Sequence, residues 1–507
     1  LIQIETAPLM PADMRVEGAT AGMTGRNRWL ALVALSLAQL MDVLDNTIVN
    51  VALPSAQYDL GFSIDNRQWI VTGYALAFGS LLPLGGRLAD LFGRKRMFLT
   101  GVIGFIVASA IGGAANGFGM LLGARIAQGA FAALLAPAAL SLVSVIFADN
   151  VKDRGRAFGI FGAVSGVGGA MGLVLGGLLT EALSWRWCLY ANLLFGIVAF
   201  AGAVTFVPLG APQRRGRLDL PGAAASTFGF IGIVYGLGNA ASNGWSGPST
   251  FGPVIAGCLL LLAFGLIERR VESPLLPLRV VLDRFRGTAY LTIWITGMGM
   301  FAVFLFLTYY VQEVLKFSPV LTGVAFLPMI GAVVVSSVMS GAMVFPRTGP
   351  LLPVLTGCLV AAFGMAMFTR IGLTTAYATH VLPALLVTGV GFGMIFSSVQ
   401  NAATSRVHPD DAGVASALVN SAQQIGGSIG VTVFNALAAT AVTAYQTSHP
   451  GMMANASIVG DQIVFWATSG VFVFGAVVAG LLFRSSPIPA RSNSGAVRSA
   501  AATERPK

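Results

Sequence analysis

Long apolar segments recur along almost the whole chain, and they constrain the fold more than any other feature. A helix needs about 20 apolar residues to cross the hydrocarbon core of a bilayer. Fourteen segments reach this length, at residues 29–53, 68–88, 97–115, 120–147, 157–180, 187–207, 220–239, 251–268, 287–311, 321–345, 350–369, 380–403, 412–440 and 462–483. Only 10% of the residues are charged, against about 25% in soluble domains. The sequence therefore predicts an all-α integral membrane protein with fourteen transmembrane helices.

The basic residues are distributed unevenly over the links between these segments. If the N-terminus lies in the cytoplasm, 25 of the 30 Lys and Arg residues fall in cytoplasmic segments, four fall in outer ones, and Arg125 lies within a helix. This bias predicts cytoplasmic termini and an even number of spans. It also accounts for the net charge of +10 without nucleic acid as a partner.

The predicted spans fall into groups of six, two and six, separated by polar links. We expect a cytoplasmic N-tail at 1–28, a six-helix bundle at 29–207, an inserted helix pair with its links at 208–286, a second six-helix bundle at 287–483 and a disordered cytoplasmic tail at 484–507. Twelve spans would result if the middle pair did not cross, although each of its segments is long enough. Duplicated halves with a binding site between them are a recurring design of secondary transporters.

Two carboxylates lie deep in the first span. A charge near the bilayer centre costs about 2.5–3.5 kcal/mol on insertion scales. Asp42 and Asp45 are three residues apart, so they share one helix face, and Asn46 extends it. No other acid of the 20 lies deep in a predicted span. We expect this face to line a polar path, at least one acid to carry a proton, and the proton chemistry to lie in the first half of the chain.

The loop Gly85–Arg96 (GGRLADLFGRKR) places one acid among four basic residues, with glycines that let helix ends approach closely. A plain cytoplasmic loop rich in positive charge is one interpretation. The other is a cytoplasmic latch that breaks and re-forms as the two halves rock, formed by Gly86, Arg87, Asp90, Gly93 and Arg94.

These motifs together resemble those of a known family. Gly85–Arg96 resembles the loop motif of the major facilitator superfamily, and Leu44–Pro54 resembles the first-helix signature of its fourteen-helix drug:proton antiporters, the EmrB/QacA type. Further similar stretches cover most of the chain, at Leu122–Pro137, Gly162–Gly177, Trp185–Asn192, Arg217–Gly222, Tyr309–Pro328 and Asp410–Gly430. The resemblance implies two six-helix bundles plus two inserted helices.

The resemblance also implies roles for the charged residues inside the spans. Asp45 occupies the family's usual acidic position, and the family's equivalent of Arg125 takes part in proton coupling. Burial disfavours a carboxylate charge and a nearby Arg favours it, so a site that moves between the two can take up and release a proton. Alternatively, Arg125 snorkels near a helix end. Asp42 stands where the family usually has an apolar residue. Its expected role is a second proton site, an attraction point for cationic substrates or a protonated hydrogen-bonding group.

The glycine-rich stretch Gly162–Gly177 resembles the family's antiporter motif, to which Gly172, Gly176 and Gly177 belong. Small residues of this kind allow close helix crossing. Leu173 stands where the family usually has Pro, which would favour a kink. This departure leaves import open beside export.

Neutral polar residues inside the spans are candidates for the substrate path, although they serve equally well to join helices. These candidates are Asn46, Asn50, Gln128, Asn192, Asn420 and Gln424. The Phe and Met residues of the second half are expected either to form an apolar substrate surface or to pack between helices, among them Phe301, Phe304, Phe306, Met394 and Phe396.

Motifs for other kinds of protein do not stand out. The chain has no Walker-type phosphate loop and no nucleophile elbow, and its three His and three Cys residues are scattered. We therefore expect no enzyme, metal or cofactor. The predicted function is a proton-coupled exporter of lipophilic, often cationic small molecules by alternating access. A dedicated exporter or importer of one metabolite is the alternative. The expected partners are the substrate, protons and membrane lipid, for a monomer in the cell inner (plasma) membrane.

Overall fold

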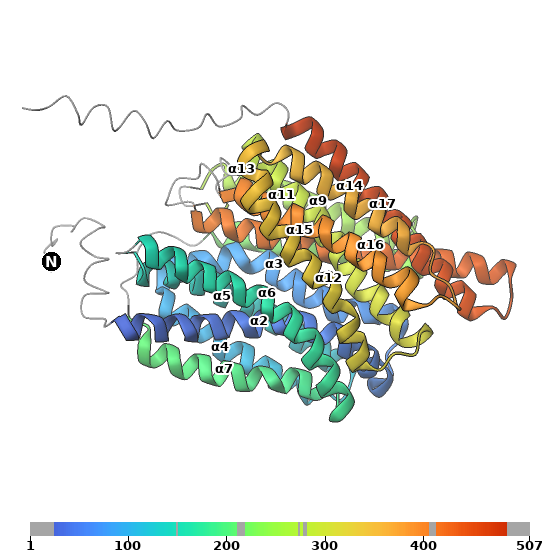
Figure 1. Ribbon diagram of the computed structural model, residues 1–507, viewed down its shortest axis with the longest axis horizontal. Helices are drawn as coiled ribbons and strands as arrows, with labels where there is room; N and C mark the ends of the chain where they lie inside the picture. The colour runs from blue at the N-terminus through green and yellow to red at the C-terminus, as the bar shows by residue number, and fades with distance from the viewer. Residues whose placement is uncertain are drawn as a thin grey trace, which may run out of the picture.

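The computed structural model describes residues 25–148, 151–209, 219–271, 274–276, 281–404 and 412–483, and these residues are almost entirely helical (Figure 1). A bilayer leaves no water to satisfy backbone groups, so a spanning chain must make its hydrogen bonds within helices. The predicted tails at 1–28 and 484–507 lie almost wholly outside the described residues, as does the loop 405–411.

Eight helices precede the second part of the chain among the described residues. They are α2 (Gly25–Leu60), α3 (Ile64–Phe92), α4 (Arg94–Gly113), α5 (Phe118–Ile146), α6 (Val151–Ala182), α7 (Arg186–Phe206), α8 (Leu220–Asn243) and α9 (Pro248–Glu268). Local chemistry sets several of the ends. Gly93 takes a φ of 97° between α3 and α4, which glycine adopts without steric cost. Asp219 accepts a hydrogen bond from the Gly222 amide (2.9 Å) and so caps the start of α8.

The second part of the chain forms six further spans, three of which contain π-helical turns. They are α11 (Arg284–Ala302) continued by η1 (Val303–Leu307) and η2 (Tyr310–Val314), α12 (Pro319–Met339) with η3 (Ser340–Val344) and α13 (Phe345–Thr348), α14 (Leu351–Phe368), η4 (Tyr377–Val381) with α15 (Leu382–Thr404), α16 (Ala412–Ser448) and α17 (Met453–Phe483).

Thirteen helices in the described part are long and apolar enough to cross a membrane, and α6 adds a shorter apolar stretch at Val167–Ala182. Together they match the fourteen predicted spans in order and position. The ends differ: α2 begins at Gly25 and continues through Pro54 to Leu60, whereas the predicted span covers 29–53. Likewise, α16 and α17 form a hairpin that extends beyond the other helix ends (Figure 1).

The longer α17 corrects one expectation about charge. Asp461 was assigned to the loop before a helix starting at 462, but α17 begins at Met453, so Asp461 lies two turns inside it. An acid therefore does lie within a helix of the second half. Hydropathy missed these two turns because Asn455, Ser457, Gly460 and Asp461 interrupt the apolar residues there, which a helix tolerates at its exposed end.

Helices α2–α7 form one group and α11–α17 another, seen as the lower and upper halves of Figure 1. The same pairing recurs in both: α2 contacts α6 and α7 as α11 contacts α16 and α17, and α4 contacts α5 and α7 as α14 contacts α15 and α17. This repetition is the duplication expected of a secondary transporter. The two groups meet along two seams, α3 against α16 and α6 against α12. Helix α8 packs on α3 and α16, and α9 packs mainly on α8.

Contacts between the two groups concentrate near the C-terminal end of α2. The Tyr309 hydroxyl donates to Oε1 of Gln57 (2.6 Å), and Nε2 of Gln312 donates to the Val51 carbonyl (3.0 Å). The guanidinium of Arg67 lies over the Tyr309 ring at 4.1 Å. One hydrophobic cluster runs through both groups at this end, whereas the other half of the first group has a cluster of its own. The groups are therefore joined most firmly at this end.

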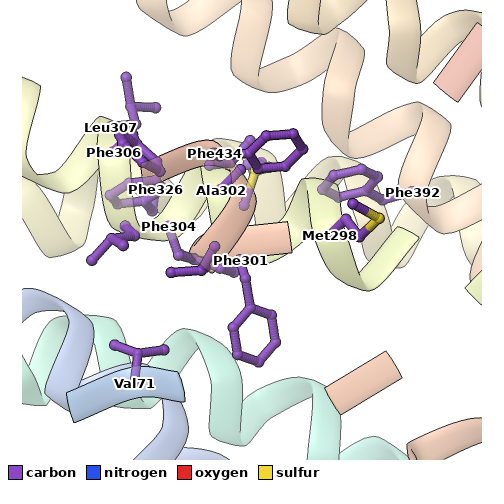
Figure 2. Packing of buried hydrophobic residues seen from close by; sticks show 14 of the residues in the cluster. Val71, Met298, Phe301, Ala302, Phe304, Phe306, Leu307, Phe326, Phe392 and Phe434 are labelled. Carbon is purple, nitrogen blue, oxygen red and sulfur yellow. The ribbon is translucent and has the colours of Figure 1, made fainter. Parts of the chain in front are cut away.

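The aromatic residues of α11 and η1 belong to the shared cluster. Phe304 and Phe306 are buried, and the Phe304 ring packs against Phe326 of α12 at 5.4 Å. Figure 2 shows Val71 of α3 facing this aromatic group from the other side. These side chains therefore pack between helices, which was one of the two expected roles.

Close packing inside the first group depends on glycine at particular positions. A Cβ on Gly129 of α5 would collide with the Tyr74 carbonyl of α3 and lie 3.1 Å from the Phe78 amide nitrogen, whereas a Cβ on Gly123 of the same helix meets nothing within 4 Å. We expect Gly129→Ala to destabilise the protein by about 1–3 kcal/mol through overpacking. Gly123→Ala is the matched control, expected to be neutral or slightly stabilising. Thermal unfolding of the purified protein measures both, and equal midpoints would contradict the prediction.

Candidate ion-coupling site

A buried ion pair forms the centre of the first helix group. Asp45 on α2 and Arg125 on α5 are 0% and 1% exposed, and Nη1 of Arg125 lies 2.5 Å from Oδ2 of Asp45. Two charges this deeply buried persist only when they pair and their remaining hydrogen-bonding positions are filled. The predicted partnership of Asp45 and Arg125 is thus present, and Arg125 does not snorkel to a helix end.

Three neutral side chains complete this pair, one from α5 itself and two from the further helices α4 and α7. Gln128, one turn beyond Arg125, accepts from Nη1 of Arg125 (2.9 Å) and donates to Oδ1 of Asp45 (3.0 Å). Asn192 of α7 donates to the same Oδ1 at 2.6 Å. Ser109 of α4 accepts from Gln128 at 2.8 Å. Asp45 therefore accepts hydrogen bonds from a cation and two amides.

Asp42 lies in different surroundings, although it is only one turn away. Its Oδ1 accepts a hydrogen bond from the Tyr74 hydroxyl of α3 (2.5 Å). The face of the Tyr74 ring lies against the guanidinium of Arg125, 4.4 Å from its Cζ, a favourable cation–π distance. Asp42 is 5% exposed. Tyr74 thus touches both the second acid and the cation that pairs with the first.

The glycines of the antiporter-like stretch bring α6 against α2 next to these acids. Cβ atoms on Gly172 and Gly176 would collide with the Thr47 hydroxyl and with Ile48 of α2, and one on Gly177 would collide with the Pro319 carbonyl of α12. The three predicted glycines therefore let α6 approach α2 on one side and α12 on the other. Leu173 is fully buried, α6 continues through it without a break, and its carbonyl faces Gly323 of α12.

Comparison with known proteins decides the family. The model of the Major Facilitator Superfamily matches residues 35–431. The chain belongs to the Major Facilitator Superfamily. Its relatives include a puromycin resistance protein of Streptomyces alboniger, 46% identical with 93% of this chain and 94% of that protein covered. A cephamycin export protein of Amycolatopsis lactamdurans is 37% identical, with 80% and 83% covered. The tetracenomycin C resistance and export protein of Streptomyces glaucescens is 32% identical, with 83% and 78% covered.

Solved structures of other transporters share this fold. A bacterial homologue of the human lysosomal transporter Spinster, crystallised inward-facing and unoccupied, superposes with a TM-score of 0.66 at 17% identity, covering 92% of this chain and 100% of that one. A peptide transporter of the POT family has a TM-score of 0.67 at 14% identity, with 92% and 98% covered. The protein is therefore a multi-pass membrane protein of this fold, in a family of transporters rather than enzymes.

In this Major Facilitator protein, the predicted latch lies at the junction of α3 and α4. Asp90 and Arg94 are 3.9 Å apart, one on each side of Gly93. Arg87 is buried, and Gly86 faces Pro137 of α5, whose Cβ lies 3.8 Å from a Cβ built on the glycine. The next residue, Lys95, donates to the carbonyls of Val204 (2.9 Å) and Val207 (2.6 Å) at the end of α7. A latch between the two halves stays a prediction.

The remaining candidates for the substrate path lie outside the ion-coupling site, on α2 and on α16. Asn50 donates to the Asn46 carbonyl of its own helix (2.7 Å), and Asn46 is partly exposed. Gln424 is buried where α16 meets Gly79 of α3, and Asn420, one turn earlier, is exposed. Gln128 and Asn192, in contrast, belong to the ion-coupling site itself.

Sequence reasoning missed two members of the site, Tyr74 and Ser109. Both are neutral and lie in apolar spans, so neither type nor position distinguished them. It also missed Asp59, which accepts from Nε1 of Trp185 (2.9 Å) and pairs with Arg186 at the far end of the first group. An exposed Asp at the end of a span gives no local signal of a partner 127 residues away.

Proposed function

We propose that this protein is a proton-coupled exporter of small, lipophilic, often cationic molecules that works by alternating access in the cell inner membrane. One observation carries the coupling: a fully buried Asp–Arg pair surrounded by hydrogen-bonding side chains from five helices, within a membrane-spanning bundle. Ionisable groups inside a membrane are costly and mark ion pathways by default. Asp42, Asp45 and Arg125 are the proposed coupling residues.

The relatives support export as the direction of transport. The most similar ones named above are described as resistance or export proteins, and the first covers nearly all of this chain. The direction is therefore proposed from the descriptions of these relatives, although Leu173 stands where the family's antiporter motif usually has Pro.

We propose that both termini are cytoplasmic, from the excess of basic residues on that side. The end at which the two helix groups are joined is then the outer end, where Val320 of α12 also donates to the Glu181 carboxylate of α6 (3.2 Å). In that orientation the protein is closed to the outside, and Gly86, Arg87, Asp90, Gly93 and Arg94 lie at the cytoplasmic face, where a latch would act in the opposite state.

A second candidate is a dedicated exporter of one natural product. The names of several relatives each specify a single antibiotic, including puromycin, cephamycin, tetracenomycin C and lincomycin. A narrow and a broad substrate range use the same coupling site, so only transport assays with several compounds separate them.

Drug accumulation in everted membrane vesicles tests the proposal. Puromycin and ethidium are the probes, and the pH gradient is imposed by respiration or by dilution. We expect accumulation of at least one probe that a protonophore abolishes, and at least a tenfold loss in Asp45→Asn. Asp153→Asn is the matched control, since it removes a partly exposed carboxylate at the start of α6 and should transport normally. Accumulation that survives the protonophore would contradict proton coupling.

A further inference from the structure

The two acids of α2 differ in how completely their charge is compensated. Asp45 has Arg125 at 2.5 Å and accepts from Gln128 and Asn192. Asp42 accepts one hydrogen bond among the described residues, from the Tyr74 hydroxyl. An ionised carboxylate with several donors and a guanidinium is much more stable than one with a single neutral donor. Asp45 is therefore paired with a cation and fully hydrogen-bonded, whereas Asp42 lies outside the ion pair and is the acid open to exchange.

We propose, on the basis of the proton-coupled export above, that Asp42 is the exchange site, where a proton and the positive charge of a monocationic substrate compete. Asp45 then remains the fixed partner of Arg125, and Tyr74 is the positioning residue between the two acids. This assigns to Asp42 the exchange that the sequence alone favoured for Asp45.

The charges around Asp42 set how many protons exchange for one bound cation. The ionisable groups that face it are Asp45 on its own helix, Tyr74 on α3 and Arg125 on α5. The nearby parts of α6 and α7 present glycine instead, at Gly168 against Leu40 and Val43 and at Gly196 against Met41. With both acids ionised, the site holds one uncompensated negative charge in a low-dielectric interior. One proton or one monocation neutralises it, so each excludes the other.

The exposed fractions of the two side chains also favour Asp42 over Asp45 as the exchange site. Asp42 is 5% exposed and Asp45 is 0% exposed. Asn46, one turn beyond Asp42 on the same face of α2, is partly exposed. The guanidinium of Arg125 lies against the ring of Tyr74. A cation arriving along this face meets Asp42 first.

The exchange then balances as follows. A cation entering from the cytoplasm displaces the proton of Asp42 to water on that side and takes its place beside the carboxylate. After the change of access, the cation leaves to the outside and a proton from outside protonates Asp42. One charge leaves the cell and one enters, so export of a monocation is electroneutral, driven by the pH gradient and independent of the membrane potential.

Proton release on substrate binding tests this directly. Tetraphenylphosphonium is the probe because it is a permanent monocation without an ionisable group. The purified full-length protein in weakly buffered detergent solution is mixed with the probe, and a pH dye counts the protons. We expect about one proton per bound cation for wild type and none for Asp42→Asn. Wild-type release from Asp42→Asn would overturn the assignment, as would release abolished only in Asp45→Asn.

Tyr74→Phe keeps the proposal testable if Asp42→Asn does not fold. The phenylalanine keeps a ring against Arg125 but loses the hydrogen bond to Asp42. Loss of a donor to the ionised carboxylate favours its protonated form, so the pH of half-maximal proton release should move upward. An unchanged pH of half-release would overturn the role of Asp42, since a purely structural Tyr74 has no influence on it.

Transport in proteoliposomes separates this inference from the proposed function. With a fixed pH gradient, the rate of tetraphenylphosphonium transport should not change when the membrane potential is clamped with potassium and valinomycin. In one outcome, the protein transports puromycin in a protonophore-sensitive way and yet neither binds tetraphenylphosphonium nor releases protons. That result would overturn the exchange at Asp42 and leave proton-coupled export standing. Loss of transport of every probe in wild type would count against the proposed function instead.

Discussion

Arg125→Met is expected to abolish transport and to lower the free energy of unfolding by about 3–5 kcal/mol. The substitution leaves the charge of Asp45 buried without its cation, and an uncompensated buried charge is strongly destabilising. It also removes the guanidinium that Gln128 and the Tyr74 ring contact. Thermal unfolding of the purified protein and vesicle transport measure the two effects.

The double variant Asp45→Asn with Arg125→Gln is the control for charge. It removes both buried charges at once, so most of the lost stability should return, while transport should not. Asp42 is unchanged in this variant, which confines the loss to the pair. A single Arg125→Met variant with wild-type stability and transport would show that the pair has no role in either.

Gly177→Ala is expected to separate the two helix groups at their joined end. A Cβ at this position lies 2.6 Å from the Cα of Val320 and collides with the Pro319 carbonyl of α12. Both contacts are with backbone, which cannot rotate away, so α6 and α12 must move apart. The closed arrangement is disfavoured, the equilibrium shifts toward the opposite state, and transport should fall at least tenfold because both states are needed in each cycle.

Spin labels at Leu183→Cys and Leu321→Cys measure this separation. Both positions are exposed near the α6–α12 seam, and Cys258, the exposed cysteine of the described residues, is replaced by Ser to avoid additional labelling. The distance distribution should shift to longer values in Gly177→Ala. Gly169→Ala on the same helix meets nothing within 4 Å and should keep the wild-type distribution. Equal distributions in the two variants would contradict the prediction.

The fold and the centre of the site were predictable because an unpaired charge inside a bilayer is energetically costly. A carboxylate and a guanidinium deep in apolar spans must pair, so Asp45 and Arg125 were recognisable as partners before their helices were placed. Likewise, the spans follow from the length of apolar runs. Tyr74 was not predictable, because an aromatic residue in an apolar helix gives no signal until α3 is packed against α2 and α5.

The helix ends show the other limit of sequence reasoning. Hydropathy ends a span where polar residues begin, but a helix continues as long as its own backbone hydrogen bonds are made. The first turns of α17 are of this kind, and they carry Asp461 into the helix. The π-helical turns that follow α11 were also unpredictable, since their register depends on how Tyr309 and Tyr310 pack against distant segments.

The position of the inserted helix pair gives the protein two unlike sides in the plane of the membrane. Helix α8 covers the seam between α3 and α16, where Trp69 packs against Tyr235 with ring centroids 6.3 Å apart and Gly238 makes room for the indole. Among the helices that the structure describes, none outside the two groups covers the other seam, between α6 and α12, and Leu178, Leu321 and Val324 there are exposed to lipid. A lipid molecule that diffuses around the protein therefore reaches the boundary between the two halves from one flank and is kept from it on the other, so the transporter has a handedness that its internal repeat alone would not give it.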